Sequence, residues 1–522
     1  MRLLLTCLLF GCASLTTAQS EVPDDWFRCP ADGPFVGTGV DRALAELLSG
    51  QTPQEVVVAV LDSGVEPDHP DLQNRLWTNA DEIPGNGIDD DNNGYIDDIH
   101  GWSFLGSEGG DLHYANLEFT RIYKDLHARF ANKSDVQISP EMQADKARYD
   151  QMTEEYVRRL EAAQQEYQLF QQLEGIIAFA QPMLEQFFGR DDYTVADLKA
   201  IDTEDEMISD LSRFMIDMME SGILYDLEGT RAHFSSAVDY AYNLDFDDRA
   251  IIGDDPTNFA QRDYGCARVE GPDATHGTHV AGIIGAENDN GIGLDGMCPS
   301  ARIMAVRIVP DGDEHDKDVA NGIYYAVDNG AQVINMSFGK SYSPSETEVD
   351  KAMAYAASKG VVLVHAAGNS NRSNDRSANF PNDDIDGNPC PTWIEVGASG
   401  PVKGKGLVAS FSNYGAINVD IFAPGEEIYS TVVDYKYERN QGTSMAAPMV
   451  AGAAALLMAY FPQLSAQDVK AILMESATPL GKQKVIIPGE AKKKTRFKKL
   501  SVSGGVLNVY AAVAIAQTRT QP

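Results

Sequence analysis

Short apolar runs rich in β-branched residues alternate along most of the chain with patterns typical of amphipathic helices. We expect buried strands over residues 56–61, 303–309, 333–336, 361–365 and 394–396, and helices over residues 318–328, 346–358 and 445–460. Apolar strands separated by helices predict an α/β fold of three layers, with a mostly parallel central sheet covered on both faces. Ligands of such folds bind at the carboxyl ends of the strands.

One long segment, residues 113–247, lacks strand patterns and contains few glycines. Apolar residues recur there at steps of three and four: Tyr149, Met152, Tyr156, Leu160, Ala163, Tyr167, Phe170 and Leu173. This spacing predicts a long helix with one apolar face, packed in a small helical bundle or a coiled hairpin. Such a face usually belongs to a core, and binding of a partner protein is the alternative.

The first residues have the features of a secretory leader. One Arg precedes an apolar run and then small residues, which predicts a signal peptide over residues 1–18. Two fates are open: cleavage after Ala18, or lipidation of Cys12, because residues 9–12 resemble a bacterial lipobox. No later stretch reaches the length of about 18 apolar residues needed for a membrane span. We therefore expect an exported protein, whether periplasmic, at the cell surface or secreted, with no transmembrane span.

Composition narrows the classes of partner. Of 522 residues, 43% are hydrophobic and 23% charged, as in folded globular proteins. The formal net charge of −37 repels phosphate backbones and argues against nucleic acid as a partner, while it makes Ca²⁺ a plausible ligand. Cys29, Cys266, Cys298 and Cys390 match no metal-binding spacing, so buried thiols or one disulfide are expected.

Four polar residues are predicted to meet at one edge of the sheet. Asp62 directly follows the first expected strand, and Asn369 follows the strand over 361–365. His276 lies in the first turn of a helical pattern, and Ser444 opens a helix of small residues. Acyl transfer requires these groups: a hydroxyl nucleophile, an imidazole base, a carboxylate that orients the imidazole, and a donor for the oxyanion.

The motifs around these residues resemble those of the subtilisin-like serine peptidases, the subtilases, of the bacterial secreted type. The resemblance rests on VAVLDSGVEPDHPDL, HGTHVAGIIGA, VINMSFG, VHAAGNS and QGTSMAAPMVAGAAALL. The order Asp, His, Ser also separates the chain from the α/β-hydrolases. The resemblance implies a subtilisin-like fold in which residues 19–112 and 248–522 form the peptidase domain and residues 113–247 a helical insertion.

The resemblance also implies roles for individual residues. Ser444 is expected to be the nucleophile, His276 the general base and then acid, and Asp62 the orienting carboxylate. Asn369 and the Ser444 backbone N–H would form the oxyanion hole. Ser337, Phe338 and Gly339 match the family's edge strand that pairs with the backbone of protein or peptide substrates, and Ala366, Ala367 and Gly368 would wall the S1 pocket, which holds the residue before the scissile bond. Asn379 stands where the family often has Gly at the base of S1.

The acidic run from Gly87 to Asp98 predicts a calcium site. Asp89, Asp91 and Asn93, followed by Gly94, fit the first half of a D-x-[DN]-x-[DN]-G loop. The Glu expected at the twelfth position is absent, so Asp97 or Asp98 must close the site, and an exposed acidic turn is the alternative. The family resemblance separately implies Asp71 and Asn290 as calcium ligands.

Two functional hypotheses follow from the sequence. The first is an exported endopeptidase that uses the Ser, His and Asp residues above. The second is a catalytically inert subtilase scaffold whose helical insertion binds a protein partner.

Overall fold

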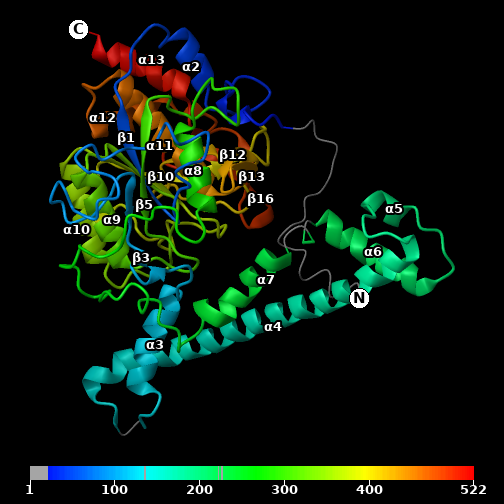
Figure 1. Cartoon of the computed structure of the whole chain (residues 1–522). Coiled ribbons are helices and arrows are strands. Elements are labelled where there is room, and N and C mark those ends of the chain that lie inside the picture. Colours follow the sequence, from blue (N-terminus) through cyan, green and yellow to red (C-terminus); the bar gives the residue numbers. More distant parts are fainter. Residues whose placement is uncertain (1–21, 135–136, 222, 225–226, 522) are drawn as a thin grey trace. The chain divides into compact units, whose positions relative to one another are not determined.

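The computed structural model describes residues 22–134, 137–221, 223–224 and 227–521 (Figure 1). The predicted leader, with Cys12 and Ala18, lies outside the described residues. The chain divides into two compact units. We call Phe119–Phe246 the helical unit, and Ser20–Glu118 together with Asp247–Pro522 the α/β unit.

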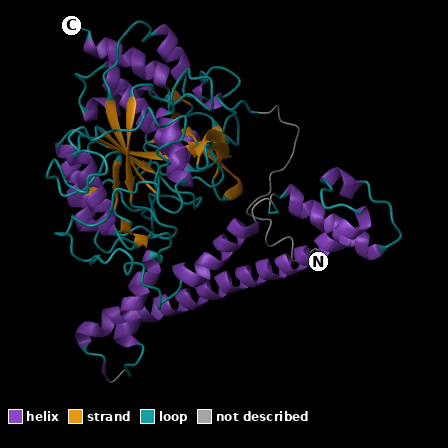
Figure 2. Cartoon of the chain, in the orientation of Figure 1, coloured by secondary structure: helices purple, strands orange, loops and turns teal. Residues whose placement is uncertain are grey.

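The α/β unit is built on a sheet of nine described strands in the order β14-β17-β11-β10-β7-β6-β1-β5-β2 (Figure 2). In that order the strands are Thr478–Pro479, Gly505–Val506, Ile421–Pro424, Trp393–Ser399, Val362–Ala366, Val333–Met336, Val56–Asp62, Ala301–Arg307 and Gly101–Ser103. All neighbours pair in parallel except β14 with β17. The predicted mostly parallel sheet is confirmed.

Helices cover both faces of the sheet. Side chains of successive strand residues point to opposite faces, so one strand contributes to two cores. Val56, Val58 and Val60 of β1 belong to one core with helices α2, α8, α11, α12 and α13, whereas Ala59 and Leu61 belong to the other core with α9 and α10. These helices are α2 (Val40–Glu46), α8 (Thr275–Gly285), α9 (Asp316–Asp328), α10 (Glu346–Ser358), α11 (Thr443–Tyr460), α12 (Ala466–Ser476) and α13 (Val509–Thr520). The predicted three layers are therefore confirmed.

Strand β5 ends earlier than its apolar pattern predicts. The expected strand covers residues 303–309, but β5 runs from Ala301 to Arg307. The backbone N–H groups of Ile308 and Val309 both donate to the carbonyl of Asp62, at 2.9 and 3.1 Å, so the chain turns over the end of β1. This turn brings the residues after β5 to the edge of the sheet where Asp62 lies.

The helical unit holds the predicted long helix. Its helices are α3 (Glu118–Phe130, whose first residue belongs to the α/β unit), α4 (Gln143–Phe188), α5 (Val195–Lys199), α6 (Glu206–Glu220) and α7 (Leu227–Ser236), followed by a π-helical turn over Ala237–Ala241. On α4 the side chains of Met152, Tyr156, Ala163, Phe170 and Leu173 are buried. Part of this face packs with α5 and α6 around Phe214 and Met215 in a separate hydrophobic core. The unit thus buries much of its apolar surface within itself.

Helix α11 is the one helix among the described residues that is long and apolar enough to cross a bilayer. Of this 18-residue window, 83% is buried, and the helix packs against β10, β7 and α8 in the α/β unit. Its apolar residues form part of the core on one face of the sheet.

The four described cysteines are free thiols. Cys298 and Cys390 are buried, and Cys29 and Cys266 are partly exposed. Burial raises the pKa of each thiol, which disfavours the thiolate. The structure therefore contains buried or partly buried thiols and no disulfide among the described cysteines.

Candidate active site

The carboxyl ends of three neighbouring strands form the base of the candidate site. Asp62 is the last residue of β1, Ser337 follows the last residue of β6, and Ala366 is the last residue of β7. These strands are adjacent in the order β7-β6-β1. Because neighbouring parallel strands end at the same edge, residues more than 300 positions apart in the chain meet there.

Asp62 and His276 form a close pair. His276 Nδ1 lies 2.6 Å from Asp62 Oδ1, and the Asp62 side chain is 1% exposed. Gly277 allows this approach, since a Cβ there would lie 2.0 Å from the carbonyl oxygen of Gly64. Helix α8 can therefore begin directly against the end of β1, with the imidazole over the carboxylate.

The surroundings of His276 favour its protonated form. Desolvation lowers the pKa of His276, but the charge of Asp62, its hydrogen bond and the charge of Asp273 together raise that pKa above its usual value. The Nδ1 atom faces Asp62, so Nε2 is the nitrogen left to exchange a proton with another group.

Ser444 lies in the first turn of α11, tied to the segment after β6. Its Oγ donates to the carbonyl of Ser337 at 3.0 Å, while Ser337 Oγ donates to the carbonyl of Ser444 at 2.9 Å. Within the described part of the chain, no hydrogen bond joins Ser444 Oγ to His276. The Ser444 hydroxyl is thus hydrogen-bonded to the Ser337 carbonyl and not to the imidazole.

Asn369 is held by the residue before Ser444. Its Oδ1 accepts hydrogen bonds from Thr443 N–H at 2.9 Å and from Thr443 Oγ1 at 3.0 Å. The amide oxygen is thereby occupied, which leaves the NH₂ group as a donor. A Cβ on Gly442 would lie 3.3 Å from Asn369 Nδ2 and 3.5 Å from Ser444 N, so two donors flank a space that glycine leaves open. An oxyanion needs donors in such an arrangement.

The predicted substrate-binding segments lie on either side of Asn379. A Cβ on Gly339 would lie 2.7 Å from Asn379 Nδ2, and one on Gly368 would lie 3.5 Å from Asn379 Oδ1. Asn379 is 7% exposed and donates to the carbonyl of Ala366 at 3.2 Å. Its side chain therefore stands between the segments Ser337 to Gly339 and Ala366 to Gly368, where the base of a pocket would be.

A buried lysine that the sequence did not single out anchors the segment after Gly339. Lys340 Nζ bonds to Glu118 Oε2 at 2.9 Å, to Asp316 Oδ1 at 2.7 Å and to the carbonyl of Glu314 at 2.6 Å. Glu118 begins α3, the helix that leads into the helical unit. These contacts join partners distant in sequence, so no local pattern in the sequence could have revealed them.

The acidic loop predicted to bind calcium uses several of its side chains to close turns. Asp89 accepts from the backbone N–H groups of Asn93 at 3.1 Å and Gly94 at 2.9 Å, and Asp97 accepts from those of Asn86 and Gly87. Asn93 Oδ1 accepts from Tyr95 N–H. Asp91 Oδ1 likewise accepts from Asn93 N–H at 2.9 Å, so all four predicted ligands of the loop are engaged with the backbone around them.

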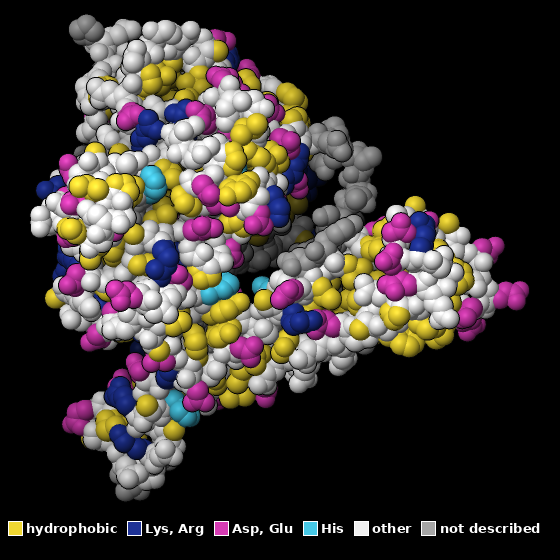
Figure 3. All heavy atoms as spheres, viewed as in Figure 1, with side chains coloured by type: hydrophobic (Ala, Val, Ile, Leu, Met, Phe, Trp, Pro, Cys, Tyr) yellow, Lys and Arg dark blue, Asp and Glu magenta, His cyan; other side chains and the backbone are white. Residues whose placement is uncertain are grey.

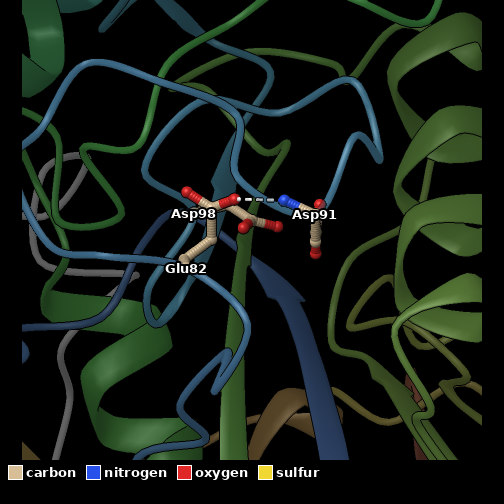
Figure 4. A group of neighbouring side chains, drawn as sticks. All are labelled: Glu82, Asp91 and Asp98. Atoms are coloured by element: carbon tan, nitrogen blue, oxygen red, sulfur yellow. Dashed lines mark hydrogen bonds between the residues drawn. The ribbon is translucent and has the colours of Figure 1, made fainter.

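A different group of carboxylates gathers beside this loop. Oxygen atoms of Glu82, Asp91 and Asp98 lie within 4.8 Å of one another (Figure 4). Of these, Asp91 was a predicted ligand and Asp98 the stated alternative to Asp97, while Glu82 was missed because it lies outside the D-x-[DN]-x-[DN]-G spacing. Asp98 is fully buried, and burial raises its pKa to about 6.

Asp71 and Asn290, the other predicted pair of ligands, are in contact. Asn290 Nδ2 donates to Asp71 Oδ1 at 2.6 Å, and Leu294 N–H donates to Asp71 Oδ2 at 3.2 Å. The Asp71 side chain is buried, and desolvation raises its pKa. Nearby in the same loop, Asn288 Oδ1 is buried and accepts no hydrogen bond from the described residues. This oxygen would gain a partner if a cation were bound.

Comparison with known proteins shows which family the chain resembles. Residues 53–487 match the Subtilase family. A thermophilic serine proteinase from Bacillus sp. (strain AK1) is 42% identical over 227 residues, which cover 43% of this chain and 51% of that protein. Subtilisin DY from Bacillus licheniformis is 39% identical over 209 residues, 40% of this chain and 71% of its own length.

A solved protease from Pseudoalteromonas arctica is 33% identical, with a TM-score of 0.37, and the match covers 46% of this chain and 70% of that one. The chain thus spans about half the length of the thermophilic proteinase and about 70% of the other two proteins.

Proposed function

Because the chain belongs to the subtilase family, we propose that it is an exported serine endopeptidase that hydrolyses peptide bonds in protein or peptide substrates through an acyl-enzyme. The observation that carries the proposal is the 2.6 Å contact of His276 with Asp62 at the sheet edge that also holds Ser444. Export rests on the leader predicted over residues 1–18, with anchoring through Cys12 as the alternative to release.

In the proposed mechanism, Ser444 Oγ turns from the Ser337 carbonyl and attacks the scissile carbonyl carbon. His276 Nε2 takes the hydroxyl proton as the C–O bond forms, and Asp62 stabilises the resulting imidazolium. The proton then passes from Nε2 to the leaving amine as the C–N bond breaks. A water molecule, deprotonated by the same imidazole, hydrolyses the acyl-enzyme.

The oxyanion of each tetrahedral intermediate would lie in the space beside Gly442. Asn369 Nδ2 and the Ser444 backbone N–H both border that space. Thr443 holds the Asn369 amide before substrate binds, so the donors need no reorganisation during the reaction. The edge segment from Ser337 to Gly339 would pair with the substrate backbone.

A serine-directed fluorophosphonate tests the proposal. Covalent labelling of the wild-type protein, and no labelling of Ser444→Ala, is expected of an active serine peptidase. Failure of the folded protein to react would favour the second candidate, an inert scaffold that binds a partner through its helical unit.

We expect Asn379→Gly to widen the S1 pocket. Removing the amide that stands between Gly339 and Gly368 should raise kcat/KM for substrates with Leu or Phe before the scissile bond. The ratio of kcat/KM for Leu or Phe to kcat/KM for Ala at that position should rise at least about tenfold, which is the effect of one or two methylenes that fit a pocket. Steady-state kinetics on a matched peptide series measures it.

Asn388→Gly is a control for this change, because Asn388 is exposed and lies in the short strand β9 (Asn388–Pro389). If Asn379→Gly left the preference among Ala, Leu and Phe unchanged, Asn379 would not form the base of S1.

We also propose a structural calcium ion. Glu82, Asp91 and Asp98 offer hard carboxylate oxygens, as calcium prefers, and a cation would offset the repulsion among these three acids. Asp89, Asn93 and Asp97 would shape the loop around the ion, and Asp71 with Asn290 would form a second site. Bound calcium would stabilise the fold there and take no part in the proposed proton transfers.

Chelation is expected to lower the melting temperature. Calcium at 100-fold excess over its Kd should add about 2.7 kcal/mol to the free energy of unfolding, because the unfolded chain does not gather these ligands. Thermal unfolding with and without a chelator measures the effect. The variant Glu82→Gln with Asp98→Asn should lose the shift that belongs to this cluster and one equivalent of calcium in a direct titration.

Asp71→Asn is the matched variant for the second site. An unchanged chelator shift and calcium stoichiometry in the Glu82→Gln, Asp98→Asn protein would contradict the assignment of this cluster.

We further propose that the helical unit, Phe119–Phe246, which lies within the insertion predicted over residues 113–247, is not needed for folding of the peptidase. Replacing Phe119–Phe246 by a short Gly/Ser linker should preserve both thermal stability and cleavage of short peptides, because the helical unit buries its own core and long loops close at little extra entropic cost. Glu118 and Arg249 must be kept. Glu118 pairs with Lys340, and Arg249 pairs with Asp318, inside the α/β unit.

Comparing kcat/KM on a short peptide and on a folded protein then assigns the role of the insertion. A selective gain on the folded protein would indicate a gate, and a selective loss would indicate a docking arm. Loss of all activity on the short peptide, with α/β stability lowered, would contradict a dispensable insertion.

A further inference from the structure

A cavity of about 370 Å³ adjoins the proposed active site within the α/β unit. His276 and Ser63 border it on one side, and the segment from Ser337 to Gly339 on another. The residues that follow β5 close it, among them Asp311 and Glu314, and Asp273 lies on the loop before α8. The cavity therefore lies beside the edge segment proposed to bind substrate and next to the proposed general base.

Its position indicates which substrate residue would enter it. In an extended substrate, successive side chains point to opposite sides. The residue before the scissile bond would point toward Asn379 and the S1 pocket. The next residue toward the substrate's N-terminus, which we call the second residue, would then point the other way, toward His276 and this cavity.

The cavity is lined by more acidic than basic groups. Asp273, Asp311 and Glu314 face one arginine, Arg307, apart from the imidazoles of His113 and His276. Arg307 is 2% exposed, and its N–H groups are used by carbonyl oxygens, by Ser103 and by Asp111. Its charge is therefore partly balanced by Asp111 and directed into the protein, while Asp273 and Asp311 are exposed at the cavity.

Two of the acids are held in place. Asp311 is exposed, and its backbone is fixed by pairing with the chain before α3: its N–H donates to the His113 carbonyl at 2.8 Å and its carbonyl accepts from Ala115 N–H at 2.9 Å. Asp273 accepts from Thr275 N–H through one oxygen at 2.9 Å. The charge of Asp273 reaches the cavity edge, since it acts on His276.

Acidity by itself does not distinguish this cavity, because the chain carries a net charge of −37 and Asp and Glu side chains are spread over the visible face of both units (Figure 3). Its location does. Charges that border the path of the substrate act on it most strongly, and these residues border it next to the reacting groups.

We propose that this cavity selects substrates with lysine or arginine as the second residue before the scissile bond, and that Asp273 and Asp311 determine that specificity. The inference rests on the proposed peptidase function and adds a substrate class to it. The apolar stem of the basic side chain would pass along Phe338, and its charged end would reach the carboxylates. A glutamate at the same position would be repelled.

Peptide kinetics test the proposal. We would use fluorogenic peptides that differ only at the second residue, which is Lys, Arg, Ala, Leu or Glu. We expect kcat/KM for Lys and Arg to exceed that for Ala by about tenfold, which corresponds to about 1.4 kcal/mol, and Glu to be the poorest. The preference should shrink as salt rises, because partly exposed charges are screened.

Variants then assign the preference to the two acids. Asp273→Asn with Asp311→Asn should remove most of the advantage of Lys and Arg over Ala, and this ratio is compared within each protein because the charge of Asp273 also acts on His276. Asp32→Asn is the matched control, because it removes the same charge from an exposed aspartate that lines a different cavity. It should keep the preference.

The outcomes separate this inference from the proposed function. Equal cleavage of all five peptides, or an unchanged preference in the double variant, would overturn the inference and leave the peptidase in place. No cleavage of any peptide, together with no fluorophosphonate labelling, would overturn both.

Discussion

Replacing Ser444 by alanine is expected to remove nearly all peptide hydrolysis while the fold stays intact. The loss in kcat should be on the order of 10⁶, a scale taken from subtilisin, a member of the same family. The fold should survive because Ser444 Oγ makes one hydrogen bond, to the Ser337 carbonyl, and Ser337 Oγ still bonds to the backbone of residue 444. Turnover of a fluorogenic peptide and a thermal melt measure the two effects.

His276→Ala should lose about as much as Ser444→Ala, and the double variant should be no worse than either single one, because the two groups transfer one proton as a unit. Ser410→Ala, an exposed serine, is a control that should keep full activity. Additive losses in the double variant, or substantial turnover in Ser444→Ala, would show that these residues do not act together.

The sheet could be predicted because its strands are buried on both faces and therefore appear as continuous apolar runs. The expected strand over residues 333–336 coincides with β6, and that over 56–61 falls one residue short of β1. The end of β5 could not be predicted, since Ile308 and Val309 are as apolar as the strand itself. The Val309 N–H shares the Asp62 carbonyl with the Ile308 N–H, so the chain turns there, over the end of a strand far away in the sequence.

The candidate site was predictable as a set of residues but not as a geometry. Sequence motifs identify Asp62, His276 and Ser444, and the structure brings Asp62 and His276 into contact. The part of Thr443 in orienting Asn369, and the space left by Gly442, depend on atoms of two segments about 70 residues apart. Such positions are ordinary small residues in the sequence, and only the folded backbone reveals what they do.

The acidic loop is a second place where the sequence predicts the residues but not how they are arranged in space. Alternating carboxylates predicted Asp89 and Asp91 as neighbouring ligands, and both side chains accept backbone N–H groups of their own turn. Glu82, which precedes the loop, meets Asp91 and Asp98 because the chain folds back on itself. A linear spacing rule describes which oxygens are close in sequence, whereas coordination depends on which are close in space.

Asn369→Ala is expected to lower kcat by about 10² to 10³, a scale taken from subtilisin, and to change KM little, because the amide would stabilise charge that develops only in the transition state. Asn388→Ala, at an exposed asparagine, should leave both parameters unchanged.

The variant Thr443→Val tests how much the orientation of the Asn369 amide matters, apart from the hydrogen bond that this amide would donate to the oxyanion. It removes the hydroxyl that donates to Asn369 Oδ1 at 3.0 Å and accepts from Gly368 N–H at 3.0 Å, but keeps the Thr443 N–H that also bonds to Asn369 Oδ1. The Asn369 amide would keep one of its two anchors, so the loss in kcat should be smaller than that of Asn369→Ala and in the same direction. In the double variant, Thr443→Val should cost little more, because the amide it orients is gone. If Asn369→Ala raised KM alone, Asn369 would bind substrate in its ground state. If the two losses in kcat simply multiplied, Thr443 would act independently of Asn369.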